Sequence, residues 1–186
     1  MDKRIGFGPR LGAWLIDAVV LCVAIGVIGP VLGGLFGAAA LSEAARQSGD
    51  SAAQGAAAGG LIGAIGGLII GAPIIGTAYF LVEGLTGYTL GKLALGLRIG
   101  SADGTLASTQ KLLIRFACKH VHFVLGLLGL FTLGMFSTIG SVLGVVAFFG
   151  CFAALSEKKQ ALHDMIAGTA VYPKAALQPV MAQPAA

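Results

Sequence analysis

The sequence contains few charged residues: only 11% of its 186 residues are Asp, Glu, Lys or Arg. A soluble domain carries roughly 25% charged residues, so this composition excludes an ordinary soluble domain. Hydrophobic residues make up 56% of the chain, and the mean hydropathy is +0.91. Such values are typical of an integral membrane protein, and the length suits one compact domain.

Cysteine is also scarce. Cys22, Cys118 and Cys151 are odd in number and lie in apolar surroundings, which excludes a disulfide framework and a cysteine metal site. We interpret them as small buried hydrophobic residues. The chain has no nucleophile with an adjacent base, no phosphate-binding loop and no metal-ligand spacing. We therefore expect neither an enzyme nor a bound cofactor or metal.

The 12 basic residues do not form the soluble basic face that nucleic-acid-binding proteins use. They lie instead at the edges of apolar runs, although the net charge is +4. This distribution predicts contact with lipid headgroups and no nucleic-acid partner. The expected partner is the lipid bilayer.

Three long apolar runs cover residues 11–40, 55–82 and 121–155. About 20 residues span the hydrocarbon core, so the first two runs each predict a membrane helix. The first run is too long for the roughly 7–15-residue core of a signal peptide, and we expect it to be retained. The third run predicts either one long tilted helix or two short helices that break near "GMFSTIG". The expected total is three or four membrane segments.

The positions of the basic residues also predict orientation, because Lys and Arg collect in cytoplasmic segments. Residues 83–122 contain five basic residues, whereas residues 42–54 contain one. We therefore expect the N-terminus, residues 83–122 and the C-terminal tail in the cytoplasm, and residues 42–54 outside. The chain is expected to be a multi-pass protein of the cell membrane.

The segments between the runs predict interfacial and cytoplasmic structure. The stretch "GYTLGKLALGLRIG" reads as a turn and a short interfacial helix, and residues 108–120 as an amphipathic helix. Residues 97–100, 105–107 and 169–172 are candidates for a small cytoplasmic β element. The membrane domain is expected to cover residues 1–172, followed by a disordered tail at 173–186.

Glycine recurs every four residues in the second apolar run. This glycine ladder is a small-xxx-small pattern that predicts a close helix crossing. Two partners are open for it: the first apolar run, where Gly29, Gly33 and Gly37 have the same spacing, or a second copy of the chain in a homo-oligomer. The ladder consists of Gly55, Gly59, Gly63, Gly67 and Gly71.

A single carboxylate, Asp17, lies inside the first apolar run, seven residues after Arg10 on the same helix face. A carboxylate at membrane depth costs several kcal/mol, so Asp17 is expected to have a cationic partner. Both a structural ion pair and a proton or cation site fit this position. We expect one charge cluster at the cytoplasmic edge, formed by Arg10, Asp17, Arg115 and Asp164 and supported by Lys92 and His163.

Several blocks occur together in the order of one known family. "RLGAWLIDAVVL", "GYTLGKLALGLRI", "DGTL", "LIRF" and "QALHDMIAGTAVY" together resemble the RDD family of small integral membrane proteins. The family is named for one arginine and two aspartates, which fall here on Arg10, Asp17 and Asp164. Before the closing "LHD", where the family often has arginine, this chain has residues 158–160, "KKQ". A role that needs guanidinium geometry is not expected there.

The resemblance implies an all-α membrane protein, a helical transmembrane bundle with interfacial helices and a small cytoplasmic β element. It also implies transport of a small ion or solute, because some members of the family are linked to sodium/proton exchange. The alternative is a membrane scaffold or assembly partner that transports nothing. Whether Asp17 faces a wet cavity or a dry contact with a basic side chain discriminates between the two.

Overall fold

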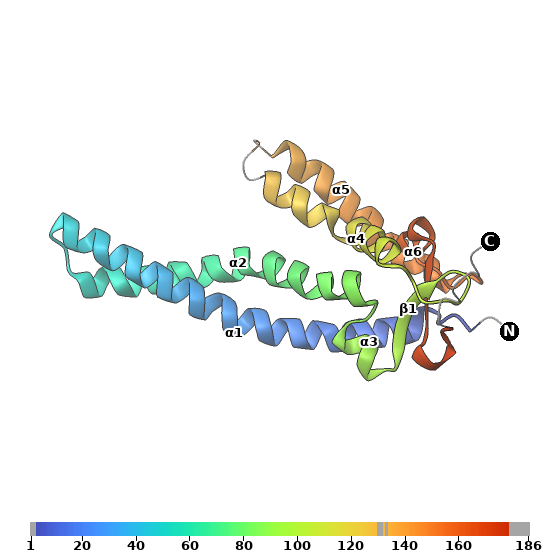
Figure 1. Cartoon of the computed structure of the whole chain (residues 1–186). Coiled ribbons are helices and arrows are strands. Elements are labelled where there is room, and N and C mark those ends of the chain that lie inside the picture. Colours follow the sequence, from blue (N-terminus) through green and yellow to red (C-terminus); the bar gives the residue numbers. More distant parts are fainter. Residues whose placement is uncertain (1–2, 130–131, 133, 179–186) are drawn as a thin grey trace, which may run out of the picture. The chain divides into compact units, whose positions relative to one another are not determined.

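The computed structural model describes residues 3–129, 132 and 134–178. Two long helices open the chain, and shorter helices and two strands follow (Figure 1). In chain order the elements are α1 (Phe7–Ser48), α2 (Ala52–Thr86), α3 (Leu90–Ala94), β1 (Leu97–Ser101), α4 (Thr109–Gly129), α5 (Met135–Gly150), η1 (Cys151–Leu155), α6 (Leu162–Ala167), β2 (Thr169–Pro173) and η2 (Lys174–Ala176).

Among the residues that the structure describes, three helical segments are long and apolar enough to cross a membrane: Phe7–Ser48, Ala52–Thr86 and Met135–Leu155. Their surfaces carry many exposed large hydrophobic side chains, as expected for helices that face lipid. The expected fold class, a helical membrane protein with a small β element, is confirmed.

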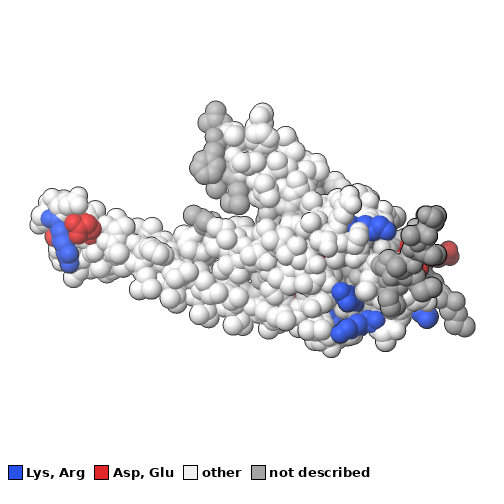
Figure 2. Space-filling view, in the orientation of Figure 1, with Lys and Arg blue, Asp and Glu red and all other residues white. Residues whose placement is uncertain are grey.

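The chain divides into two compact units. One is Ala18–Ala78, and the other combines Met1–Asp17 with Tyr79–Ala186. In the first unit the charged residues are Glu43, Arg46 and Asp50, all near the turn between α1 and α2. On the face that Figure 2 shows, the rest of this unit has an uncharged surface. This pattern suits a helical hairpin in lipid.

The glycine ladder lies where α1 and α2 cross within the first unit. A Cβ on Gly29 would lie 2.8 Å from the carbonyl oxygen of Gly67, and a Cβ on Gly33 would collide with the backbone of Gly63. Only glycine lets two helix backbones approach this closely. Gly71 differs, because a Cβ there would meet Gly29 at an ordinary 3.7 Å.

The small sheet lies in the second unit. β1 pairs antiparallel with β2, with Ile99 opposite Val171 and both side chains fully buried. The expected strands at 97–100 and 169–172 are confirmed. Residues 105–107 form no strand; Leu106 makes an isolated bridge to Gly100, and Thr105 makes one to Gln178.

The third apolar run forms separate helices. α4 continues the expected amphipathic helix to Gly129, and α5 begins at Met135 after Gly134, whose φ of +82° favours glycine. The two helices pack closely: a Cβ on Gly140 would lie 2.9 Å from the carbonyl oxygen of His122. Of the two alternatives for this run, the structure has the two short helices.

The C-terminal segment is ordered further than the sequence predicts. The N–H of Lys174 donates to the carbonyl oxygen of Gly96 at 2.7 Å, and that of Leu106 donates to Gln178 at 3.1 Å. The predicted disorder is therefore wrong for residues 173–178, because these backbone bonds attach them to the sheet. Residues 179–186 lie outside the described residues.

Candidate functional site

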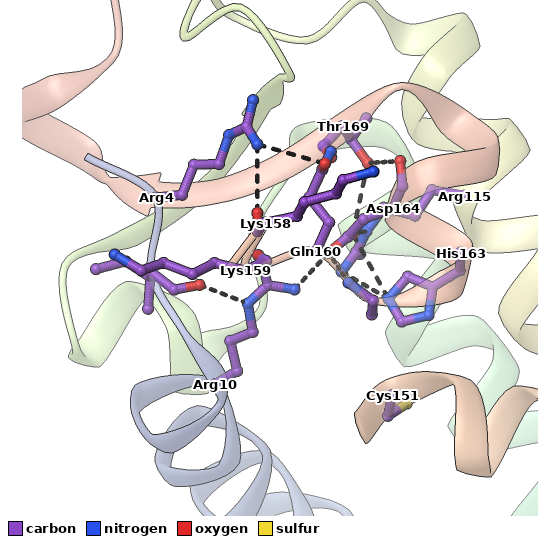
Figure 3. A network of polar contacts seen from close by, with 12 residues as sticks. Arg4, Arg10, Arg115, Cys151, Lys158, Lys159, Gln160, His163, Asp164 and Thr169 are labelled. Carbon is purple, nitrogen blue, oxygen red and sulfur yellow. Dashed lines mark hydrogen bonds and ion pairs between the residues drawn. The ribbon is translucent and has the colours of Figure 1, made fainter. Parts of the chain in front are cut away.

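Asp164, in the first turn of α6, is a fully buried carboxylate held by two guanidinium groups. Arg10 donates to Oδ2, and Nε of Arg115 donates to Oδ1 at 2.6 Å (Figure 3). Burial alone would raise the pKa of Asp164, but the charges of Arg115 and Arg10 outweigh it and hold this pKa well below its usual range. Asp164 therefore stays ionised, with its charge neutralised.

Arg115, from α4, connects Asp164 to two further groups. One guanidinium nitrogen pairs with Glu83, and another lies 3.2 Å from Nε2 of His163. Burial, and then the charge of Arg115, lower the pKa of His163 well below its usual value. His163 is thus a neutral imidazole that accepts a hydrogen bond from Arg115.

Glu83, in the last turn of α2, has three cationic partners although its side chain is only 3% exposed. Besides Arg115, Nζ of Lys92 lies 3.0 Å away and Nζ of Lys119 lies 3.3 Å away. Glu83 was not among the site residues predicted from the sequence. The available signal was charge imbalance: residues 84–122 contain five basic residues and a single acidic one, Asp103, so their partner had to lie elsewhere.

Lys92 is buried on the short helix α3, outside the membrane spans. Burial lowers the pKa of Lys92 to about 8, although the carboxylates of Asp17 and Asp164 oppose this shift. We define the charge cluster by its contacts as Arg10, Glu83, Lys92, Arg115, Lys119, His163 and Asp164.

Asp17 is 1% exposed and lies beside the charge cluster in a different environment. The hydroxyl groups of Tyr79 and Thr89 each donate to its carboxylate at 2.6 Å, and the backbone N–H of Gly91 donates at 2.7 Å. Gly91 must be glycine, because a Cβ there would collide with the carbonyl oxygen of Ala13 and lie 2.8 Å from Asp17. In the described chain, Asp17 forms no ion pair.

The structure thus joins Arg10, Arg115 and Asp164, with Lys92 and His163 close by, but it separates Asp17 from their ion pairs. The expected cationic partner of Asp17 is wrong, because α3 brings neutral donors to the carboxylate instead.

A model of the RDD family matches residues 4–168. The chain belongs to the RDD family. No curated protein and no solved structure matches the chain. In this RDD protein the name-giving arginine and the second aspartate, Arg10 and Asp164, bond to each other, whereas the first aspartate, Asp17, is bound by neutral groups.

The segment before the closing "LHD" of this RDD protein accepts hydrogen bonds from two arginines through its backbone carbonyl groups. Nη2 of Arg10 donates to the carbonyl oxygen of Lys159 at 2.7 Å, and Nη1 of Arg4 donates to that of Lys158 at 3.2 Å (Figure 3). A backbone carbonyl oxygen accepts such a bond whatever the side chain of its own residue is. The lysines at these positions are therefore compatible with the bonds observed.

Asp17 does not line either of two cavities that lie in the described part of the protein. One, of about 270 Å³, is polar and lies beside the sheet, where Arg4, Asp103 and Tyr172 line it. The other, of about 210 Å³, is apolar and lies among α4, α5 and α6, with Cys118 and His163 at its wall.

Proposed function

We propose that this RDD protein exchanges a small monovalent cation for a proton across the membrane, with Asp17 as the cation ligand. The observation that carries the proposal is the contrast between the two aspartates. Asp164 is neutralised by two guanidinium groups, whereas Asp17 is equally buried, lies in the apolar helix α1 and has only neutral partners. Ionisable groups of this kind mark ion pathways in membrane proteins.

The partners of Asp17 suit a hard cation, which prefers oxygen ligands. The site offers the two carboxylate oxygens of Asp17 and the hydroxyl oxygens of Tyr79 and Thr89. Each hydroxyl oxygen lies 2.6 Å from the carboxylate. A hydroxyl group can donate to the carboxylate when no cation is bound, and can turn its lone pairs to a cation when one arrives. The same side chains therefore serve both states of the exchange.

In this proposal the charge cluster has a structural role and holds the helices of the transporter together. Its ion pairs connect α1, α2, α4 and α6, and removal of Asp164 would leave Arg10 buried without an ionic partner. Asp17, with no ion pair to lose, is free to change its charge state. We place the cluster at the cytoplasmic edge of the cell membrane, in agreement with the excess of Lys and Arg around it.

The test is a flux measurement with purified protein in proteoliposomes that contain a pH-sensitive dye. An imposed Na⁺ gradient should change the internal pH with the wild-type protein. Asp17→Asn keeps the shape of the side chain, so it should leave the protein folded and abolish the signal. Glu157→Gln, at an exposed position, is the control and should behave as wild type. Flux that persists in the Asp17→Asn variant would refute the proposed site.

A second function, a membrane scaffold or assembly partner without transport or catalysis, is supported by one observation. Asp17 has its hydrogen bonds satisfied and lines neither cavity, as a structural carboxylate would. The scaffold predicts no flux of Na⁺, K⁺ or Li⁺ with the wild-type protein, and loss of stability in Asp17→Asn. A homo-oligomer would belong to this alternative, and its cross-linked mass would reveal it.

A further inference from the structure

The apolar cavity lies between close helix contacts. α4, α5 and α6 contact one another (Figure 1). On α5, a Cβ on Gly140 would lie 2.9 Å from the carbonyl oxygen of His122, and a Cβ on Gly150 would lie 2.7 Å from Cβ of Leu162. Between these two contacts, Ala147 lines the cavity of about 210 Å³. Packed protein interiors contain few voids larger than a water molecule, so we expect a space of this size to be occupied.

Large apolar side chains of the cavity wall are also exposed on the surface. Val121, Val146 and Ile166 line the cavity, and their exposed fractions are 38%, 48% and 59%. α5 belongs to the candidate membrane segment Met135–Leu155, so this surface faces hydrocarbon. An apolar cavity offers water too few hydrogen-bond partners to hold it. The molecule that can enter from this side is therefore the acyl chain of a lipid.

Lys111 supplies a positive charge at the end of α4 nearest the sheet. It precedes Cys118, a wall residue, by seven residues, so it lies on the same helix face about 10 Å nearer the start of α4. A Cβ on Gly168, just after α6, would lie 4.0 Å from Cε of Lys111. The headgroup region of a bilayer is about 5–8 Å deep on each side of the hydrocarbon. A lipid with one chain in the cavity can therefore place its phosphate group near Lys111.

The charge of Lys111 has no anionic partner in the described part of the chain. Nζ of Lys111 donates to the hydroxyl oxygen of Ser101 at 3.2 Å, whereas Lys92 and Lys119 both pair with Glu83. A phosphate group would supply the missing negative charge. Phosphatidylcholine also carries a phosphate, but its choline group brings a positive charge to the same place. The surroundings of Lys111 therefore favour a lipid with a net negative headgroup.

We propose that this cavity binds one acyl chain of an anionic phospholipid of the cytoplasmic leaflet, with the phosphate group of the lipid paired to the ammonium group of Lys111. The chain acts on the charge cluster through His163, which lines the cavity and lies 3.2 Å from a guanidinium nitrogen of Arg115. A chain in the cavity keeps water from this side of the cluster, and ion pairs are stronger where water is excluded. The lipid thus stabilises the folded protein, whether or not the protein transports a cation.

The experiment uses delipidated wild-type protein in detergent, to which phosphatidylglycerol or phosphatidylcholine is added. Native mass spectrometry counts the bound lipids, and thermal unfolding measures their effect. The wild-type protein should retain one phosphatidylglycerol molecule and unfold at a higher temperature with it. Phosphatidylglycerol should bind about fivefold more tightly than phosphatidylcholine, which is the preference expected of one lysine beside an anionic headgroup.

Two pairs of variants separate the chain from the headgroup. Ala147→Phe fills the cavity and should lose the bound lipid and its effect on unfolding. Val145→Phe is the matched control, because Val145 is 56% exposed on α5 and does not line the cavity. Lys111→Met should bind the two lipids equally, whereas Lys111→Arg should keep the preference for phosphatidylglycerol. Lys174→Met, at an exposed position on η2, should behave as wild type.

Three outcomes would overturn the inference. The first is a folded Ala147→Phe variant that retains phosphatidylglycerol as the wild type does, since the lipid would then lie elsewhere. The second is an unchanged lipid preference in Lys111→Met, a measurement that holds even if Ala147→Phe does not fold. The third is an equal rise in unfolding temperature with sodium oleate or with inorganic phosphate, because the ligand would then not be a phospholipid. None of these outcomes bears on Na⁺-driven proton flux, so the proposed function is tested separately.

Discussion

The phenolic oxygen of Tyr79 lies 2.6 Å from Oδ1 of Asp17 and also accepts a hydrogen bond from the backbone N–H of Leu90 at 3.2 Å. One hydroxyl group therefore joins the end of α2 to the carboxylate on α1 and to the start of α3. Since Thr89 and Gly91 bond to the same carboxylate, Asp17 fixes the position of α3 as well as serving as the proposed cation ligand.

Tyr79→Phe should weaken this attachment. Hydrogen bonds to charged groups contribute about 1.5–3 kcal/mol, so the variant should lose about that much stability, seen as a lower unfolding temperature in detergent. Tyr88→Phe is the matched control, because Tyr88 contacts Arg98 through its ring and should lose little. If both variants unfold at the wild-type temperature, the Tyr79 hydroxyl does not stabilise the fold.

Asp164→Asn should be more damaging. The substitution removes the charge that pairs with Arg10 and Arg115; it leaves Arg10 buried without an ionic partner and Arg115 with Glu83 alone. Breaking a buried pair in this way costs about 3–5 kcal/mol. Thermal unfolding in detergent measures the loss, with Glu157→Gln as the exposed control. A loss below about 1 kcal/mol, the range of surface ion pairs, would mean that the cluster is not structural.

The same carboxylate predicts the response to acid. The pKa of Asp164 is lower in the folded protein than in the unfolded chain, where it is about 3.9. Its stabilising effect is therefore complete above about pH 4 and is lost as the pH falls further, because the unfolded state then binds the proton first. The unfolding temperature should fall between pH 5 and pH 2 in the wild type and fall less in Asp164→Asn. An equal fall in both proteins would assign the acid response to other groups.

The arrangement around Asp17 illustrates what the sequence could and could not predict. A carboxylate in an apolar run indicates a buried partner, but not its chemistry. The donors Tyr79, Thr89 and Gly91 lie 62 to 74 residues away, and two of the three bonds come from groups that carry no sequence signature, a threonine hydroxyl and a backbone N–H. The sequence pattern therefore predicted a cationic partner for Asp17, whereas the folded protein supplies neutral hydrogen-bond donors instead.

Local patterns succeeded where the periodicity itself decides the structure. The strands at 97–100 and 169–172, the amphipathic helix from 108 and the apolar helices all follow from hydrophobic spacing. Glu83 was missed because it stands at the end of an apolar run. A carboxylate at that place is also what the end of an ordinary membrane helix would show. The three cationic partners of Glu83 come from α3 and α4, and only the fold brings them together.

The glycine ladder offers a test with a close internal control. A Cβ on Gly63 would collide with the backbone of Gly33, whereas a Cβ on Gly66 would meet no atom within 4 Å. Gly63→Ala should therefore lower stability by about 1–3 kcal/mol through overpacking. Gly66→Ala should be neutral or raise it by up to about 1 kcal/mol, because alanine favours the helix. Equal unfolding temperatures for the two variants would show that α1 and α2 do not touch along this face.

The last prediction concerns topology and the hairpin of α4 and α5. From Arg115, in the charge cluster, α4 has 14 residues to its end at Gly129, which is about 21 Å at a rise of about 1.5 Å per residue. The hydrocarbon core is about 30 Å thick. A Cβ on Gly129 would collide with Ser137 of α5, so the chain turns back at this depth. If the cluster lies at the cytoplasmic surface, the hairpin enters the membrane without crossing it.

Cysteine labelling in a background without Cys22, Cys118 and Cys151 measures this topology. A membrane-impermeant maleimide added outside intact cells should modify a cysteine at Ser48 and spare one at Ser101. A cysteine at Thr132, near the tip of the hairpin, should be spared in intact cells and also in inverted vesicles, because it lies within the hydrocarbon. Labelling of Thr132→Cys from outside would mean that the hairpin crosses the membrane. The cluster would then have to lie deeper than the cytoplasmic surface, because a reach of about 21 Å is too short to cross from there.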